Sequence, residues 1–503
     1  MNTPDSTFTE LSQFALSEEV ITLISLEFCL ENNVVVLGDE KNAPSQGRPV
    51  GMLNPKDKTL LLEVERQLKC QIIPVQLNEW EIRHALAEAW VITDVDDNRN
   101  DMMLLKESKT IDFSPKKNIQ ELWEEILSVA VKQRATDVHI ECYREDVDLR
   151  FRVDGVLHQV TSPISIENVA KCVSALKIIS RLKITEKRRP QNGAFRSHYI
   201  TESGEEKIID MRVAILPGPF GEDTVIRLLD KIGAHESLSQ LGMNDRTIEQ
   251  LKKAIQNTYG LVLIAGPTGA GKSSTFYSII EQINVDGNKI LSIEDPIEYE
   301  MNKVNQKQVS SLLGFADYTK AFMRQDPDIL LVGEINDEET ALACIRASQV
   351  GKMVYSTLHA NDAIGIVMRL QLLGIQHDIL AENLVACLSQ RLLRVLCPSC
   401  RTKEIISEEN KVYFKGLDHG EEQWVAVGCD DCDAKGYKGR TGVYEIMLVN
   451  SKIKGLISSK ASMSHIREEA LSQGFETLVV DALAKAREGI TSLDEVRRVV
   501  QVW

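Results

Sequence analysis

The run "GPTGAGKSS" at residues 266–274 constrains the fold of this chain more than any other feature of its sequence. It follows an apolar run at 261–264 and precedes a stretch, 276–283, whose apolar residues are spaced for one face of a helix. This order predicts a strand, a glycine-rich loop and a helix. A phosphate-binding loop that opens a helix is the central element of P-loop α/β domains, so we expect an α/β fold here.

The residues of the loop fit the chemistry of a bound nucleotide. Glycines let backbone N–H groups approach phosphate oxygens, and the start of the helix adds the positive end of its dipole. Lys272 can reach the β- and γ-phosphates, and the hydroxyl of Ser273 can bind Mg²⁺. The residues expected to bind the nucleotide are Gly266, Pro267, Thr268, Gly269, Ala270, Gly271, Lys272, Ser273 and Ser274.

Composition narrows the class of partner. The 503 residues suffice for several domains, and 58 Lys and Arg against 74 Asp and Glu give a net charge of −16. This balance disfavours a general polyanion binder, which needs a basic surface, so we expect no nucleic acid partner. Neither a signal peptide nor a membrane span fits the beginning of the sequence. The chain is therefore expected to be cytoplasmic, and any role at a membrane peripheral.

Four of the ten cysteines form two Cys-x-x-Cys pairs, in "CPSC" and "CDDC". Such pairs each turn two thiolates toward one ion and suit a closed tetrahedral zinc site. The expected Zn²⁺ ligands are Cys397, Cys400, Cys429 and Cys432. Because protein would fill all four positions, the zinc would be structural. The alternative is two unrelated redox or buried pairs; the other six cysteines are expected to be buried single thiols.

Changes of pattern divide the chain into predicted parts. Residues 1–100 carry no motif with chemistry and indicate a small docking domain, and the polar residues 101–118 indicate a linker or, alternatively, an ordered loop. Alternating apolar residues in 119–232 predict hairpin strands and an α+β domain. The nucleotide domain is expected at 241–503, with the zinc-binding insertion at 397–432.

Three further apolar runs in the nucleotide domain end in polar side chains. "KILSIED" ends at Glu294 and Asp295, "DILLVGE" at Glu334 and "KMVYSTLH" at His359. Parallel strands carry functional groups at their carboxyl ends, so these groups are expected to converge on the nucleotide. Glu334 would then orient Mg²⁺ or water, and His359 would contact the γ-phosphate. The alternatives are a helix-start charge, a turn cap and a buried histidine.

Several stretches resemble, in the same order, the motifs of one known family. "GPTGAGKS", "SIEDPIEY", "RQDPDILLVGEIND", "STLHANDA", "QRLLRVLCPSC" and "GRTGVYEIM" resemble the phosphate loop, aspartate box, Walker B segment, histidine box and zinc-domain flanks of the type II/IV secretion ATPases, the GspE/PilB group. "RATDVHIE", "RFRVDGVL" and "RRPQNGAFR" extend the resemblance to residues 119–503.

The resemblance implies a RecA-like P-loop domain and an ATP-hydrolysing motor. Such motors are homohexamers at the cytoplasmic face of the bacterial inner membrane, use ATP and Mg²⁺, and move a membrane platform protein. The N-terminal domain would bind the platform or its cytoplasmic adaptor. Type IV pilus assembly is the expected role, with type II protein secretion as the alternative.

The resemblance also implies roles for single residues. Lys272 and Ser273 would hold phosphates and Mg²⁺, Glu334 would act at the Walker B position, and His359 would sense the γ-phosphate. Glu294 would be the other candidate to activate water.

Three arginines match family arginines that close on the nucleotide, namely Arg212, Arg227 and Arg324, the first two from the neighbouring α+β domain. Taken alone, without the resemblance, Arg212 and Arg227 fit ordinary charges on an exposed strand face better than a role at the nucleotide.

One position departs from the family pattern. The family commonly has "GEIRD" where this chain has Asn336 in place of the arginine. The missing charge beside Glu334 leaves two further hypotheses open: a slow ATPase, and a scaffold that binds ATP without turnover. A nucleic-acid translocase is the remaining alternative, against which the acidic composition argues.

Overall fold

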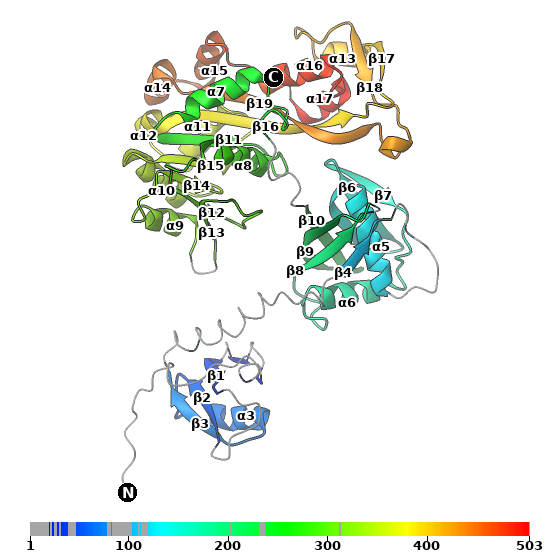
Figure 1. Cartoon of the computed structure of the whole chain (residues 1–503), viewed down its shortest axis with the longest axis vertical. Coiled ribbons are helices and arrows are strands. Elements are labelled where there is room, and N and C mark those ends of the chain that lie inside the picture. The colour runs from blue at the N-terminus through cyan, green and yellow to red at the C-terminus, as the bar shows by residue number, and fades with distance from the viewer. Residues whose placement is uncertain are drawn as a thin grey trace. The chain divides into compact units, whose positions relative to one another are not determined.

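The structure is a computed structural model (Figure 1). It describes residues 20, 23–24, 28–29, 32–38, 47–77, 82, 103–108, 111, 119–201, 203–230, 237–310 and 313–501. The chain divides into two compact units, Met1–Met102 and Met103–Trp503. Among the described residues, no helix combines the length and the apolar character needed to cross a membrane.

The first unit contains a small sheet covered by a helix. Its elements are β1 (Val34–Val36), β2 (Arg48–Met52), α3 (Lys58–Leu68) and β3 (Ile72–Gln76). β1 is antiparallel to β2, and β2 is parallel to β3 with α3 as the crossover between them. Asp57 caps the start of α3 by accepting the N–H groups of Thr59 and Leu60.

The second unit begins with a sheet of seven strands. They are β4 (Met103–Lys106), β5 (Ala135–Cys142), β6 (Val147–Val153), β7 (Val156–Val160), β8 (Gln191–Ile200), β9 (Glu206–Gly218) and β10 (Gly221–Asp230), in the order β4-β8-β9-β10-β5-β6-β7. Helices α5 (Ile119–Lys132) and α6 (Val169–Ile179) pack on it. The buried Trp123 of α5 donates its Nε1–H to the carbonyl of Cys172 in α6 at 2.9 Å, which ties the two helices together.

The sequence assignment of 101–118 to a linker is wrong for part of that segment. Residues Met103–Lys106 form β4, which pairs in parallel with β8, and Met103 and Leu105 lie in the core of this sheet. Because most of the surrounding residues are polar, the composition of the segment indicated a linker and gave no sign of this short strand. Most of the remaining residues of the segment lie outside the described part of the chain.

A second seven-stranded sheet forms the centre of the domain expected at 241–503. Its strands are β11 (Gly260–Ala265), β12 (Ile290–Glu294), β13 (Val304–Gln308), β14 (Ile329–Val332), β15 (Met353–Leu358), β16 (Leu384–Leu396) and β19 (Tyr437–Leu448), in the order β13-β12-β14-β15-β11-β16-β19. All neighbours are parallel except β16 and β19. β11, β14 and β15 are buried along their whole lengths, as expected for parallel strands covered on both faces.

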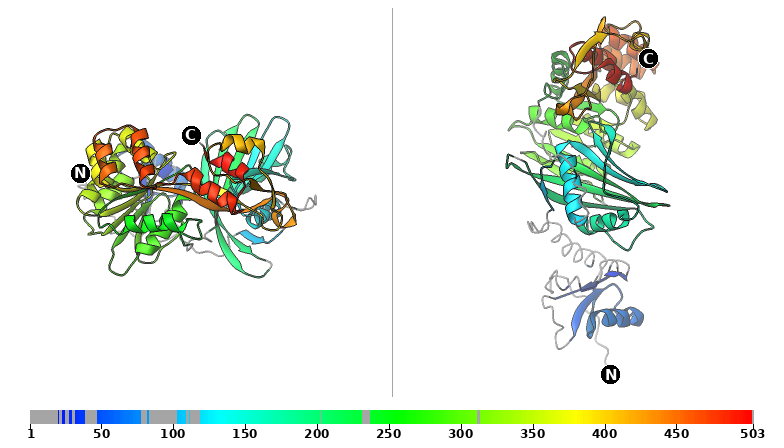
Figure 2. Two further views of the ribbon diagram at one scale, coloured as in Figure 1. Left: turned by 90° about the horizontal axis from the view of Figure 1, so that it is seen from above. Right: turned by 90° about the vertical axis from the view of Figure 1, so that its right-hand side faces the viewer.

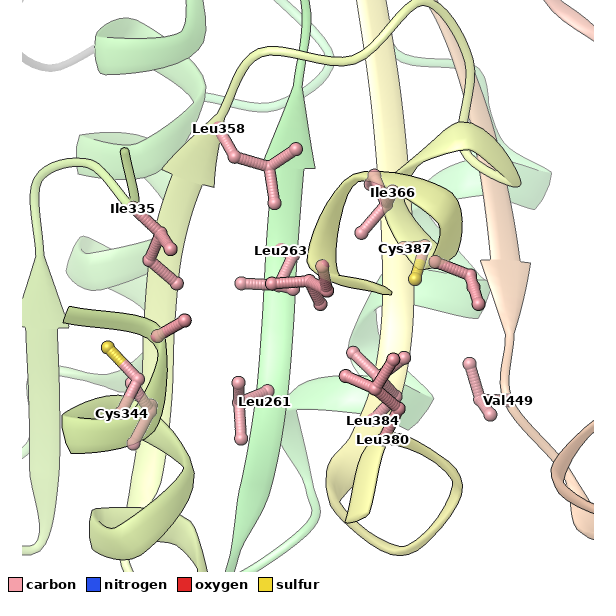
Figure 3. Close-up of a cluster of buried hydrophobic side chains, with 14 of the residues drawn as sticks. Leu261, Leu263, Ile335, Cys344, Leu358, Ile366, Leu380, Leu384, Cys387 and Val449 are labelled. Carbon is pink, nitrogen blue, oxygen red and sulfur yellow. The ribbon is translucent and has the colours of Figure 1, made fainter. Parts of the chain in front are cut away.

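Helices cover both faces of this sheet (Figures 1 and 2). They are α7 (Asp245–Ile255), α8 (Lys272–Ile283), α9 (Phe315–Phe322), α10 (Glu338–Gln349), α11 (Gly365–Leu372), α12 (His377–Asn383), α14 (Ser451–Ser458), α15 (Met463–Ser472), α16 (Leu478–Arg487) and α17 (Leu493–Val499). Figure 3 shows Leu261 and Leu263 of β11 among Cys344, Ile366 and Leu380 from α10, α11 and α12. The alternate residues of β11 pack on the other side with α7 and α8. The helical spacing at 276–283 thus predicted α8 correctly.

The cysteine pairs lie where β16 and β19 leave the sheet. These strands pair as far as Leu396 and Tyr437, next to the first cysteine pair (Figure 1). The insertion between them holds β17 (Thr402–Ile405), α13 (Glu408–Tyr413), β18 (Glu422–Val425) and the short 3₁₀ helix η2 (Asp430–Cys432). β17 and β18 form an antiparallel pair.

Candidate nucleotide site and metal centre

The parallel register gathers the expected site residues at one edge of the central sheet. Paired residues at this edge are Ala265 with Leu358, Ser356 with Val332, and Val332 with Ile293. Gly266, Glu294, Glu334 and His359 each follow one of these strand ends within two residues. The four motifs therefore meet around the start of α8.

The loop between β11 and α8 has the backbone that its glycines permit. Gly269 and Gly271 have φ angles of 77° and 82°, in the left-handed region that favours glycine. The Lys272 ammonium donates to the carbonyl of Gly266 at 2.8 Å. Burial lowers the pKa of Lys272, and the nearby carboxylate of Glu334 opposes this effect. The charged lysine is thus held beside the acidic strand end.

Gln390 and Arg391 of β16 support this loop, and neither was predicted as a site residue. The Gln390 amide donates to the carbonyl of Ala270 at 2.6 Å, and a Cβ on Gly266 would lie 2.8 Å from the Gln390 carbonyl oxygen. Arg391 donates to the carbonyl of Asn361 at 2.6 Å. Their only signal in the sequence is their place at the start of "QRLLRVL".

Glu334 and His359 form a pair at the surface of the site. His359 Nε2 lies 2.8 Å from Glu334 Oε1, and Asn336 donates to Glu334 Oε2 at 2.9 Å. The backbone supports this geometry, since Ile335 donates its N–H to the carbonyl of Thr357 in β15. The side chains of Glu334 and His359 are 28% and 47% exposed, so both can meet a ligand. Asn336 therefore orients the glutamate although it lacks a charge.

Glu294, by contrast, is buried and saturated with hydrogen bonds. Its carboxylate accepts from the Tyr277 hydroxyl, from Ser292 at 2.7 Å and from Gln306 at 3.0 Å. Burial, with the charge of Glu294 adding to it, raises the pKa of Tyr277, which keeps the phenol protonated as a donor. The side chain of Glu294 thus joins α8, β12 and β13.

Glu298 is the acidic residue that sequence reasoning missed at this site. Its carboxylate accepts the hydroxyl of Ser273, the expected Mg²⁺ ligand, at 3.2 Å. Loss of solvent around the carboxylate raises the pKa of Glu298, whereas the Ser273 hydroxyl and the charges of Arg212 and Arg227 lower it. Glu298 is the third carboxylate of "EDPIE", which was the one available signal.

The structure brings two of the three expected arginines together. Arg212 and Arg227 are direct partners across β9 and β10, both are exposed, and Arg227 Nε lies 3.0 Å from Asp137 Oδ1. The charges of both arginines oppose the rise in the pKa of Glu298 that loss of solvent causes. Arg324 lies exposed just after α9, and no side-chain contact within the described part of the chain joins it to these residues.

The four paired cysteines form one cluster. Their sulfur atoms all lie within 4.8 Å of one another, with separations of 3.8 Å for Cys397–Cys429, 3.9 Å for Cys400–Cys432 and 3.8 Å for Cys429–Cys432. A tetrahedron with Zn–S bonds of about 2.3 Å has sulfur–sulfur edges of about 3.8 Å. Backbone N–H groups also point at the sulfurs, for example from Gly428 and Gly436. The donor set and its spacing fit zinc.

A cavity of about 500 Å³ adjoins the phosphate loop on the side of residues 359–363, called here the histidine segment. Its lining includes Gly266, His359, Asp362, Met368 and Arg467. The cavity therefore continues the site from the phosphate loop toward α11 and α15.

Comparison with known families covers nearly the whole chain. The sequence profile of the family described as "Type II/IV secretion system protein" matches residues 113–498, and the profile of the "MshEN domain" matches residues 5–89.

Individual relatives carry two kinds of name. "Type II secretion system protein E" of Aeromonas hydrophila is 35% identical over 95% of this chain and 97% of its own length. "Type IV pilus assembly ATPase TfpB" of Acinetobacter baylyi is 40% identical over 76% of this chain and 66% of its own length. "Type IV pilus assembly ATPase PilB" of Myxococcus xanthus is 34% identical over 97% of this chain and 87% of its own length.

The fold also matches a solved structure. The ATPase DotB of Legionella pneumophila aligns with a TM-score of 0.56 at 18% identity, over 79% of this chain and 99% of that chain. At this level of identity the likeness shows the fold alone.

The hydrogen bonds of Glu294 predict a structural effect of its removal. Glu294→Ala would leave the buried donors of Tyr277 and Ser292 without their acceptor, so the free energy of unfolding should fall by about 1–3 kcal/mol. Glu298→Ala, at an exposed position, should change it by less than about 0.5 kcal/mol. Thermal unfolding followed by circular dichroism measures both. Equal stability of the two variants would contradict the anchoring role of Glu294.

Proposed function

Because the chain belongs to the type II/IV secretion system protein family, we propose that it is an ATP-hydrolysing motor that powers type IV pilus assembly. The observation that carries this proposal is the meeting of Lys272, Ser273, Glu334 and His359 at one edge of the central sheet. ATP and Mg²⁺ are the cofactors that these residues fit. Type II protein secretion is the second candidate, favoured by the full-length similarity to the Aeromonas hydrophila protein.

We assign the chemical roles as follows from the contacts. Lys272 binds the β- and γ-phosphates, and Ser273 ligates Mg²⁺, which neutralises phosphate charge when bound. His359 and Asn336 hold Glu334 toward this centre.

Glu298 is better placed than Glu294 to take a proton from the attacking water. It touches Ser273 and is exposed, so its carboxylate can meet a water molecule beside the Ser273 hydroxyl. Glu294 is occupied by three protein donors.

The proposed assembly is a homohexamer at the cytoplasmic face of the inner membrane. The N-terminal domain, matched by the MshEN profile, would bind the membrane platform protein or its cytoplasmic adaptor. The relatives named above support a secretion or pilus system. They give no support to the alternative of a nucleic-acid translocase.

Loss of the phosphate-loop lysine should abolish function without unfolding the protein. Lys272→Ala removes the cation from the phosphates, so ATP hydrolysis, measured as phosphate release, should vanish. Lys303→Ala, at an exposed ion pair with Asp286, is the matched control and should hydrolyse ATP normally. In cells, Lys272→Ala should remove pili seen by electron microscopy. Loss of secreted proteins with pili intact would favour type II secretion, and turnover stimulated only by single-stranded DNA would favour a translocase.

The cysteine cluster should carry about one zinc ion per chain by elemental analysis. Cys400→Ala should lose the zinc and loosen the insertion, because metal binding supplies local folding free energy. Cys142→Ala changes a half-buried thiol in the other sheet and should keep the zinc. Pilus assembly should suffer more than ATP turnover. Protein purified without chelator and free of zinc would contradict the proposed centre.

The two arginines of the α+β domain should act on turnover rather than on binding. Arginines aimed at the charge that develops on the γ-phosphate contribute roughly 10³ to 10⁵ in rate. Arg212→Ala and Arg227→Ala should therefore bind ATP nearly normally and hydrolyse it slowly. Nucleotide titration and phosphate release separate the two effects.

Mixing inactive chains tests whether these arginines act across subunits. Lys272→Ala keeps the arginines, and the double variant Arg212→Ala/Arg227→Ala keeps the phosphate loop. Partial return of activity in mixed rings would place arginines and loop on different chains. No return, in rings shown by tagged pull-down to hold both chains, would mean that the arginines act within their own chain or not at all.

A further inference from the structure

The stretch "GRTGVYEIM", which forms most of β19, has no role in the site described above, yet it contains an acidic residue with almost no solvent contact. Glu445 is 3% exposed and lies beside Ser389 of β16 in the antiparallel register. A buried carboxylate needs hydrogen-bond donors or a neighbouring cation to offset the loss of water. The question is which segments supply them.

Two backbone N–H groups from distant segments meet the carboxylate of Glu445. Oε1 accepts the N–H of Ala363 at 2.7 Å, and Oε2 accepts the N–H of Leu478 at 2.9 Å. Ala363 closes the segment that begins at His359. Leu478 is the first residue of α16, whose preceding residue Thr477 makes no side-chain cap, so Glu445 supplies the acceptor that this helix end lacks.

The segment from His359 to Ala363 is held at three further points. Arg391 of β16 donates to the carbonyl of Asn361 at 2.6 Å, and Arg467 of α15 lies 2.6 Å from Asp362. At the start of the segment, His359 contacts Glu334 at 2.8 Å. Of these contacts, those of Glu445 and Arg391 come from strands of the central sheet, β19 and β16, and Glu445 holds the end opposite His359.

We propose that Glu445 is a positioning residue that sets the place of His359 in the nucleotide site, and that it joins this segment to α16. The inference rests on the proposed role of His359. Its physical basis is that one buried carboxylate accepts both N–H groups, that of Ala363 and that of Leu478. If Glu445 moved with one of these segments, it would lose its hydrogen bond to the other.

Glu445 is buried near a few charged side chains, so its carboxylate depends on the two N–H donors. Burial raises the pKa of Glu445 to about 7, and the two N–H donors oppose this rise. Three charged side chains face it: Asp362 from the segment that begins at His359, Arg467 from α15 and Arg391 from β16. α16 packs through Leu483 and Ala486 into the cluster that also contains Phe414 of the zinc insertion. α16 thus contacts both Glu445, through Leu478, and the apolar cluster that includes the insertion.

Glu445→Gln tests the proposal because an amide can accept one N–H but must present its own NH₂ to the other. The variant should lower kcat roughly 10-fold or more, the scale of a misplaced catalytic group, while KM for ATP changes little. Glu445→Asp retains the charge but is one methylene shorter, so it should also lower kcat. It replaces Glu445→Gln as the test if the amide variant folds poorly. Melting temperature and zinc content are measured on every variant.

Glu495→Gln is the matched control. Glu495 is equally buried in the same domain, but its carboxylate binds Arg394 and Arg498 and does not touch the histidine segment. A merely structural role predicts that both glutamine variants lower the melting temperature and leave kcat unchanged. The positioning role predicts that only Glu445→Gln lowers kcat.

A double-mutant cycle with His359 decides between the remaining outcomes. His359→Ala should slow turnover roughly 10²-fold, and adding Glu445→Gln should then cost almost nothing more, because the group that it positions is gone. Additive losses, or normal kcat in a folded Glu445→Gln beside a slow His359→Ala, would overturn this inference alone. Normal turnover by His359→Ala would overturn the proposed role of the histidine and this inference with it.

Discussion

The parallel pairing of β11 with both of its neighbours is the constraint on which the site depends. β15 flanks β11 in one continuous register, β16 does so from Val262 onward after a shift beside Leu261, and all three strands are buried through most of their length. A shift by one residue would turn every side chain of a strand to the opposite face, so the two apolar helix layers hold the register firmly. In this register the phosphate loop, His359, Gln390 and Arg391 reach one another. The chemistry at the edge is thus secured by apolar packing along Leu261 and Leu263.

Much of this candidate site could be predicted because its residues follow strands that can be recognised from a few neighbouring residues. The runs before Gly266, Glu334 and His359 are short and apolar, and each leads into a polar residue. Glu298 and the saturation of Glu294 could not be predicted in this way. They depend on side chains of Tyr277, Ser273 and Gln306, which come from other segments and reach the carboxylates only in three dimensions.

Long-range strand pairing accounts for the other differences. Residues 103–106 read as part of a polar linker, and only the parallel pairing with β8 makes them a strand. Arg212 and Arg227 stand on strand faces that the sequence alone leaves ambiguous, and the β9–β10 register makes them neighbours. Two exposed arginines side by side repel each other, and the carboxylate of Asp137, 3.0 Å from Arg227, offsets part of this charge.

The β16–β19 pair connects the two chemical centres. At one end, the Arg394 guanidinium lies 3.9 Å from the ring centre of Tyr437. The same guanidinium binds the buried Glu495 of α17, and this contact holds α17 against β16 near the cysteine cluster. At the other end, Gln390 and Glu445 hold the phosphate loop and the histidine segment. The antiparallel pairing runs from Ala386 and Leu448 to Arg394 and Arg440, and after an irregular step it ends at Leu396 and Tyr437. Side chains of the same two strands therefore support the cysteine insertion at one end of the pair and the candidate nucleotide site at the other, and the irregular step in the pairing lies at the insertion end.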